Sequence, residues 1–191
     1  MTRLVAGIAT LNLPSLFAAA RKRILLHAAV YGPFADSAPH REALTTALAK
    51  PDFERLDIID LTDAQPWSAP FMHALRLDAT KEEHAKTLHA SHEFLHELKK
   101  AYPEKTHVYP QHTIPCMPII IIDDTIIFGQ YAHCEDYAAN GFWGIIKADV
   151  ETLFDWAKTN RPGNASDQEV AAYRLICECH HAMTGELNEH S

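Results

Sequence analysis

Two short apolar runs separated by a helical segment constrain the fold of this chain more than any other feature. Residues 24–30 (Ile-Leu-Leu-His-Ala-Ala-Val) are nearly all apolar and stop at Gly32-Pro33, and residues 56–61 form a second such run. Runs of this length are typical of strands buried on both faces. Between residues 36 and 51, apolar side chains recur at helical spacing. A strand–helix–strand unit implies a right-handed crossover and parallel strands, so we predict an α/β fold.

The rest of the chain continues the alternation of strands and helices. Thr80 and Glu83 form a capping-box pattern that opens a long helix reaching about Tyr102. Residues 118–129 predict a tight β-hairpin that turns at Asp123-Asp124-Thr125, with Ile119–Ile122 deeply buried. We also expect a loop of packed aromatic side chains at 62–79, strands at 106–109 and 143–147, and helices capped by Asp149 and Ser166.

Length and composition fit a single domain. The 191 residues are 47% hydrophobic, which supplies a core without disulfide or metal support. We expect residues 1–160 to form the α/β domain, and residues 161–191 to form a linker and a C-terminal helix packed on it. The first twenty residues imitate a signal peptide, but Asn12 and Pro14 interrupt them, and Ser15–Arg23 reads as an amphipathic helix.

Charge and cysteine content indicate the environment of the protein. The four cysteines lack the spacing of a disulfide framework, and no segment is long enough to span a membrane, so we expect a cytoplasmic protein. The 25 acidic and 17 basic residues give a net charge of -8, which argues against bulk nucleic-acid binding. Thirteen histidines are many for this length, and they should make the net charge less negative on mild acidification.

The order of these elements resembles one half of the phospholipase-D-like superfamily. The resemblance covers roughly residues 15–158 and lies in the strand at 24–30, the helix at 80–102 and the segment Pro118-Ile119-Ile120-Ile121-Ile122-Asp123-Asp124 with Ile126-Ile127-Phe128-Gly129 after it. It implies a half-sized domain in which a mixed central sheet is flanked by helices, with an extra C-terminal helix in this chain.

Active members of that superfamily carry the motif H-x-K-x(4)-D at this strand, where His is the nucleophile, Lys binds the phosphate and Asp orients the His. When Asp123 is placed on the motif's Asp, Cys116 takes the nucleophile position and Pro118 the Lys position. Proline can supply neither charge nor a hydrogen bond to a phosphoryl group. The resemblance therefore implies a non-catalytic, homodimeric sensor or interaction module that binds a small anionic ligand or a protein partner; a phosphodiesterase with a non-standard His site is an alternative.

The hairpin should gather a candidate ligand site at one end of the sheet, where open α/β folds bind ligands. The residues that we assign to this site are His112, Cys116, Asp123, Tyr131 and His133. Asp123 also fits ordinary turn chemistry, and the histidines and Cys116 also fit loop and core positions.

Two histidine spacings suggest zinc as an alternative cofactor, although the main prediction includes no cofactor. His92-Glu93-Phe94-Leu95-His96 is an H-E-x-x-H pattern on a predicted helix, in which both His would hold the metal and Glu93 would deprotonate its water. Such a zinc hydrolase needs a third ligand, and the sequence offers no convincing one. Cys177 and His181 lie four residues apart in the last helix and form only a two-residue clip.

Overall fold

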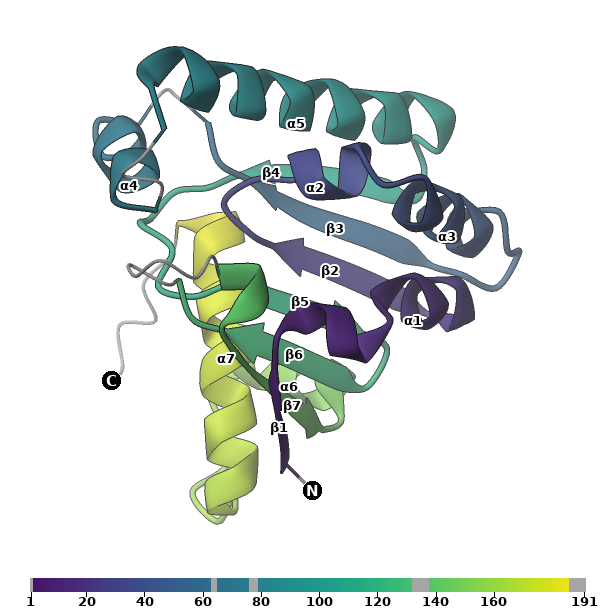
Figure 1. Cartoon of the computed structure of the whole chain (residues 1–191). Helices are drawn as coiled ribbons and strands as arrows, with labels where there is room; N and C mark the ends of the chain where they lie inside the picture. Colours follow the sequence, from purple (N-terminus) through teal and green to yellow (C-terminus); the bar gives the residue numbers. More distant parts are fainter. Residues whose placement is uncertain (1, 63–64, 76–78, 132–137, 186–191) are drawn as a thin grey trace.

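One mixed sheet organises the part of the chain that the structure, a computed structural model, describes: residues 2–62, 65–75, 79–131 and 138–185. The described residues form seven strands in the order β1-β7-β6-β5-β2-β3-β4, with helices on both faces (Figure 1). The strands are β1 (Thr2–Ala6), β2 (Arg23–His27), β3 (Arg55–Asp60), β4 (Thr106–Pro110), β5 (Ile119–Ile122), β6 (Thr125–Gly129) and β7 (Phe142–Lys147). The helices are η1 (Ile8–Leu11), α1 (Leu13–Ala19), α2 (Gly32–Ala35), α3 (Ala38–Leu48), α4 (Ser68–Leu75), α5 (Lys81–Ala101), η2 (Ala138–Asn140), α6 (Val150–Thr159) and α7 (Asp167–Thr184).

The strand–helix–strand unit predicted from the sequence is confirmed. β2 pairs with β3 and β3 with β4, all in parallel, through the crossover helices α3 and α5. The long helix α5 begins with the expected capping box, because the Thr80 hydroxyl accepts a hydrogen bond from the Glu83 amide while the Glu83 carboxylate accepts one from the Thr80 amide. The carboxyl ends of the three parallel strands therefore lie at one edge of the sheet, toward which β2 and β3 point in Figure 1.

The isoleucine-rich strand β5 lies in the interior of the sheet, as predicted. It is antiparallel to both β2 and β6, and all four of its side chains are buried. The hairpin turns at Asp123, which has a φ of 49°. Aspartate tolerates this left-handed conformation better than most residues. Because β5 runs antiparallel to β2, it begins at the edge where the parallel strands end.

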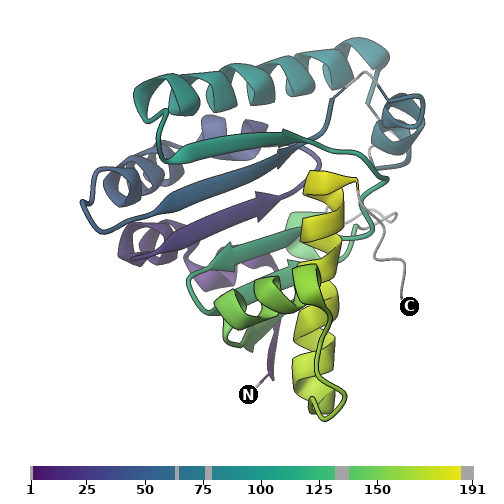
Figure 2. The ribbon, with the colours of Figure 1, turned by 180° about the vertical axis from the view of Figure 1, so that it is seen from behind.

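Helices cover the two faces of the sheet and define two cores. On one face, α1, α3 and α5 pack with buried residues such as Phe17, Leu44 and Phe94 over Ile24, Leu26 and Ile58. On the other face, α6 and α7 pack over Leu25, Ile59, Ile121 and Ile146 (Figure 2). The alternation of neighbouring β2 residues between the two cores follows from the two-residue period of a strand. The fold is the mixed α/β arrangement that we predicted.

Several elements differ from the prediction. Helix α1 covers Leu13–Ala19 instead of Ser15–Arg23, and Arg23 already begins β2. The amino-terminal residues Thr2–Ala6 form the edge strand β1, which pairs with β7; its side chains are mostly exposed, so it lacks the apolar signal of a buried strand. Residues Ser68–Leu75 form helix α4 where we expected a loop. Pro70 obscured this helix in the sequence, yet it lies in the first turn, where a helix needs no amide donor.

No helix formed by the described residues is both long enough and apolar enough to cross a membrane. This agrees with the absence of a long apolar run in the sequence.

Candidate functional site

A buried histidine marks the carboxyl edge of the parallel strands. His27, the last residue of β2, is 1% exposed, and its Nε2 donates a hydrogen bond of 3.1 Å to the Oε1 atom of Gln111, just after β4. Gln111 in turn donates to the carbonyl oxygen of Thr113 at 2.8 Å. Burial lowers the pKa of His27 to about 4, although its bond to Gln111 acts in the opposite direction. His27 is therefore neutral at physiological pH, and it links the end of β2 to the residue that follows β4.

The turn that follows β2 is fixed by a fully buried tyrosine. The Tyr31 hydroxyl donates to the carbonyl oxygens of Ile59 at 2.6 Å and Leu26 at 3.0 Å, and accepts from the amide of Ala28 at 3.1 Å. The Ser91 hydroxyl of α5 accepts from the amides of Tyr31 and Gly32, at 2.9 and 3.2 Å. These bonds satisfy the polar backbone groups where β2 and β3 separate, and they tie α5 to this edge.

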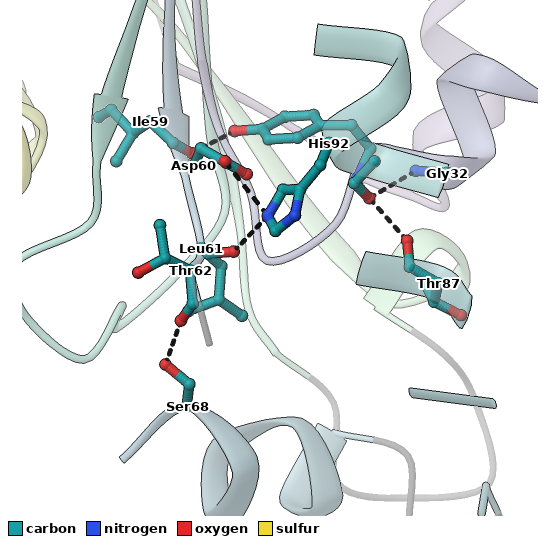
Figure 3. Close-up of polar contacts among 10 residues, drawn as sticks. Gly32, Ile59, Asp60, Leu61, Thr62, Ser68, Thr87 and His92 are labelled. Atoms are coloured by element: carbon teal, nitrogen blue, oxygen red, sulfur yellow. Dashed lines mark hydrogen bonds and ion pairs between the residues drawn. The ribbon is translucent and has the colours of Figure 1, made fainter. Parts of the chain in front are cut away.

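His92 of α5 reaches the end of β3 (Figure 3). Its Nε2 lies 3.3 Å from Oδ2 of Asp60 and 3.2 Å from the carbonyl oxygen of Leu61. Because a carbonyl oxygen can only accept, Nε2 carries the hydrogen in that bond, which fixes the tautomer of a neutral His92. Burial raises the pKa of Asp60 to about 6, and the charge of His92 lowers it in part. The pair is thus a proton-sensitive contact between α5 and the sheet.

A cleft of about 480 Å³ opens beside His92, between α4 and α5. Its volume lies in the range of small-molecule sites, about 300–1,000 Å³. From α4 it is lined by Ser68, Ala69, Met72 and His73, and from α5 and the residue before its cap by Ala79, Lys81, His84, Ala85, Leu88, His89 and His92. The described lining includes one lysine and four histidines but no carboxylate.

Helix α4 also covers the carboxyl edge of the sheet with apolar side chains. Met72 is buried with Ala29 and Leu61, which follow β2 and β3, and Trp67 and Phe71 pack against this group. The ring of Phe71 meets that of Tyr131, which follows β6, edge-on at 5.4 Å between centroids. Ser68 holds the start of α4 in place, because its hydroxyl donates to the carbonyl oxygen of Thr62 at 2.5 Å.

The structure brings three residues of the predicted ligand site, His112, Cys116 and Tyr131, to the same end of the sheet. Cys116 and Tyr131 lie close enough to interact electrostatically, and burial raises the pKa of both. His112 lies at the same edge against the end of α7, where its amide donates to the carbonyl oxygen of Ala182 at 3.3 Å. His133 lies outside the described residues.

Asp123 lies at the opposite end of β5 from Cys116. Its carboxylate accepts hydrogen bonds from the amides of Arg21, Lys22 and Arg23, with distances between 2.8 and 3.2 Å. These amides belong to the turn that enters β2. The structure thus gives Asp123 a bonding role in the turns and does not bring it together with the other predicted site residues.

The H-E-x-x-H residues have other partners in the structure. His92 binds Asp60 and Leu61 as described, while Glu93 forms an exposed pair with His89 at 3.3 Å. His96 is exposed one turn further along α5. In α7, Cys177 is half-buried, and its thiol hydrogen-bonds with the Tyr173 hydroxyl. Among the described residues, no group of three His, Cys, Asp or Glu side chains is placed to hold a metal ion.

Sequence reasoning missed the cleft residues His73 and Lys81, and it missed Asp60, which contacts the cleft residue His92. His73 and Lys81 lie on either side of residues 76–78 in the sequence, and Asp60 ends an apolar strand. The signal that could have found them is the density of histidines around positions 73–92, combined with the rule that strand ends of an open sheet approach the next helix.

No protein-family model matches this sequence, and no curated protein matches it. Solved structures do match. NucT from Helicobacter pylori is 14% identical, with a TM-score of 0.47 over 93% of this chain and 96% of that one. Phosphatidylserine synthase from Haemophilus influenzae is 14% identical, with a TM-score of 0.46 over 97% of this chain and 44% of that one. Both are members of the phospholipase D superfamily.

A third solved structure is TrmBL2, an archaeal chromatin protein described as having a novel mode of DNA binding; it is 19% identical, with a TM-score of 0.42 over 83% of this chain and 50% of that one. This match contradicts the prediction that the chain does not bind nucleic acid in bulk. That prediction used only the net charge of -8. The net charge of a whole chain does not exclude a basic surface on one face of the protein. At these identities, the three likenesses concern the fold alone.

Proposed function

We propose that this protein is a phospholipase-D-like domain that has lost the phosphodiesterase chemistry of its superfamily and acts as a sensor or regulatory module by binding a small anionic ligand. We place it in the cytoplasm, where its thiols would stay reduced. In the part of the chain that the structure describes, Cys116, Cys177 and Cys179 form no disulfide. The proposal includes no cofactor.

The observation that carries the proposal is the start of β5. Pro118 directly precedes the interior strand β5. In the alignment that we propose, Pro118 takes the lysine position of the superfamily motif and Cys116 takes the nucleophile position. A phosphodiester reaction needs an activated nucleophile and positive groups beside the developing phosphoryl charge. Pro118 supplies no charge, and burial, followed by the charge of Glu178, raises the pKa of the Cys116 thiol. Only a thiolate is a good nucleophile, so this cysteine is poorly suited to replace the histidine.

The packing of α4 supports the same conclusion. Met72, Phe71 and Trp67 bring apolar groups to the carboxyl edge beside Tyr131, where a polar, preorganised site would be needed for phosphoryl transfer. The described residues that line the cleft at this edge include imidazoles and a lysine but no carboxylate. Hydrogen-bond donors of this kind suit the binding of an anion.

A calorimetric titration tests this proposal. Purified protein at pH 6.5 and low salt is titrated with inorganic phosphate, phenyl phosphate and bis(4-nitrophenyl) phosphate, and the diester sample is then assayed for released 4-nitrophenolate. We expect saturable heat from at least one of these anions and no release of product. Absence of binding by every anion, or release of product above the rate in buffer, would overturn the proposal.

A further inference from the structure

We propose that the cleft between α4 and α5 is the ligand site and that its ligand is a phosphate monoester with an apolar body. This inference builds on the proposed function, because it names the place and the chemical class of the ligand. It assigns the site to residues other than the predicted set at His112, Cys116 and Tyr131.

The charge of the cleft selects an anion. The chain has 25 acidic residues, yet none is among the described residues that line this cleft, which carry one ammonium and four imidazoles. Two acids contact histidines of the cleft without lining it themselves: Asp60 lies 3.3 Å from His92, and Glu93 lies 3.3 Å from His89. The contacts with an anion therefore fall mainly to Lys81 and His73. A cation would find few acceptors on these walls, and no described trio of side chains is placed for a metal.

The geometry favours a phosphoryl group over a carboxylate. Donors come from both walls: His73 from α4 and Lys81 from α5. The rings of His73 and His84 approach each other across the cleft, with centroids 6.4 Å apart. A phosphate monoester presents three oxygens in different directions and can contact donors on both helices, whereas the two oxygens of a carboxylate lie in one plane.

The other walls of the cleft are apolar and favour a ligand with an apolar group beside the phosphate. Leu88, Ala69 and Ala85 line the same cleft; Ala69 and Ala85 are exposed, and Leu88 is half-buried. Apolar surface of this kind gains free energy when a ligand displaces water from it. An ester with a small aromatic or aliphatic body therefore fits better than inorganic phosphate.

Matched variants test the site. Lys81→Met and His73→Gln each remove a donor from the cleft, while Lys86→Met and His96→Gln remove the same kinds of group from other positions on α5 that do not line it. Each protein is titrated at pH 6.5 with phenyl phosphate, inorganic phosphate, benzoate and zinc chloride. Thermal melting and circular dichroism of every variant establish that it is folded.

We expect phenyl phosphate to bind more tightly than inorganic phosphate or benzoate, and each cleft variant to lose affinity by about tenfold, as for one charged contact. The two controls should stay within about twofold of the wild type. Equal binding of phenyl phosphate by wild type and both cleft variants would overturn this site while leaving the proposed function in place. Stoichiometric zinc that is lost in His73→Gln would overturn the ligand class. If Lys81→Met does not fold, His73→Gln and its control His96→Gln decide.

Discussion

Nε2 of His92 lies 3.3 Å from Oδ2 of Asp60, so an imidazole of α5 contacts the last residue of β3. The two residues are distant in sequence, and their contact joins the helix that lines the cleft to the sheet. Because the pKa of Asp60 is raised to about 6, mainly by burial, this contact changes its charge under mildly acidic conditions.

Asp60 should make the protein less stable as the pH rises from about 4 to 6. The folded state keeps the Asp60 proton up to about pH 6, while the unfolded state releases it near the ordinary value of 3.8. The stabilising contribution is therefore present below that lower pKa and is lost as the pH rises through the higher one. Asp60→Asn should remove this slope in urea unfolding measured between pH 4 and 7. The exposed control Asp52→Asn should keep it, and an unchanged slope in Asp60→Asn would contradict the assignment.

His27 should make the protein more stable as the pH rises, which is the opposite of the effect of Asp60. Its folded pKa of about 4 lies below its ordinary value of 6.5, so acidification protonates the unfolded state first. Stability is complete above pH 6.5 and falls by up to about 3 kcal/mol as the pH drops to 4. His27→Gln keeps a donor for Gln111 but does not titrate, so its unfolding free energy should lose this acid-side decline. If His27→Gln and the wild type decline equally, His27 is not buried as a neutral group.

Replacing Asp123 should reduce stability without affecting ligand binding. Its carboxylate accepts bonds from three consecutive amides, and its φ is 49°. Asp123→Asn retains an acceptor and tolerates this backbone, so we expect a loss of about 1 kcal/mol; Asp123→Ala loses all acceptors and is strained, which should cost about 2–3 kcal/mol. The exposed neighbour control Asp124→Asn should change the unfolding free energy by less than about 0.5 kcal/mol. Weakened anion binding in folded Asp123→Asn would argue instead for a ligand role.

The Tyr31 hydroxyl should contribute strongly to stability. Tyr31→Phe would leave the buried carbonyl oxygens of Leu26 and Ile59 without this donor and the Ala28 amide without this acceptor. We expect denaturant unfolding to report a loss of about 2–3 kcal/mol. Tyr102→Phe is the matched control, since the Tyr102 hydroxyl makes no hydrogen bond within the described part of the chain, and it should cost much less. Comparable losses in the two variants would show that ring packing, not the hydroxyl, matters.

Local patterns predicted the elements whose sequence signal is strong. The run Ile119–Ile122 with its Asp-Asp turn predicted the interior hairpin, and Thr80 with Glu83 predicted the start of α5. β1 was not predicted because an exposed edge strand has no alternating apolar pattern. α4 was not predicted because Pro70 resembles a helix breaker. The cleft could not be predicted from local patterns. It depends on the approach of α4 to α5 and on a long-range contact between Asp60 and His92.

Turnover of a phosphodiester tests the central claim most directly. The wild-type protein and the variant Cys116→Ala are incubated with bis(4-nitrophenyl) phosphate at pH 6.5 and 7.5, and released 4-nitrophenolate is followed spectrophotometrically. On our proposal that Cys116 and Pro118 take the nucleophile and lysine positions of the superfamily motif, we predict that both proteins release product at the rate of buffer alone. Turnover by the wild type that is lost in Cys116→Ala would contradict this account.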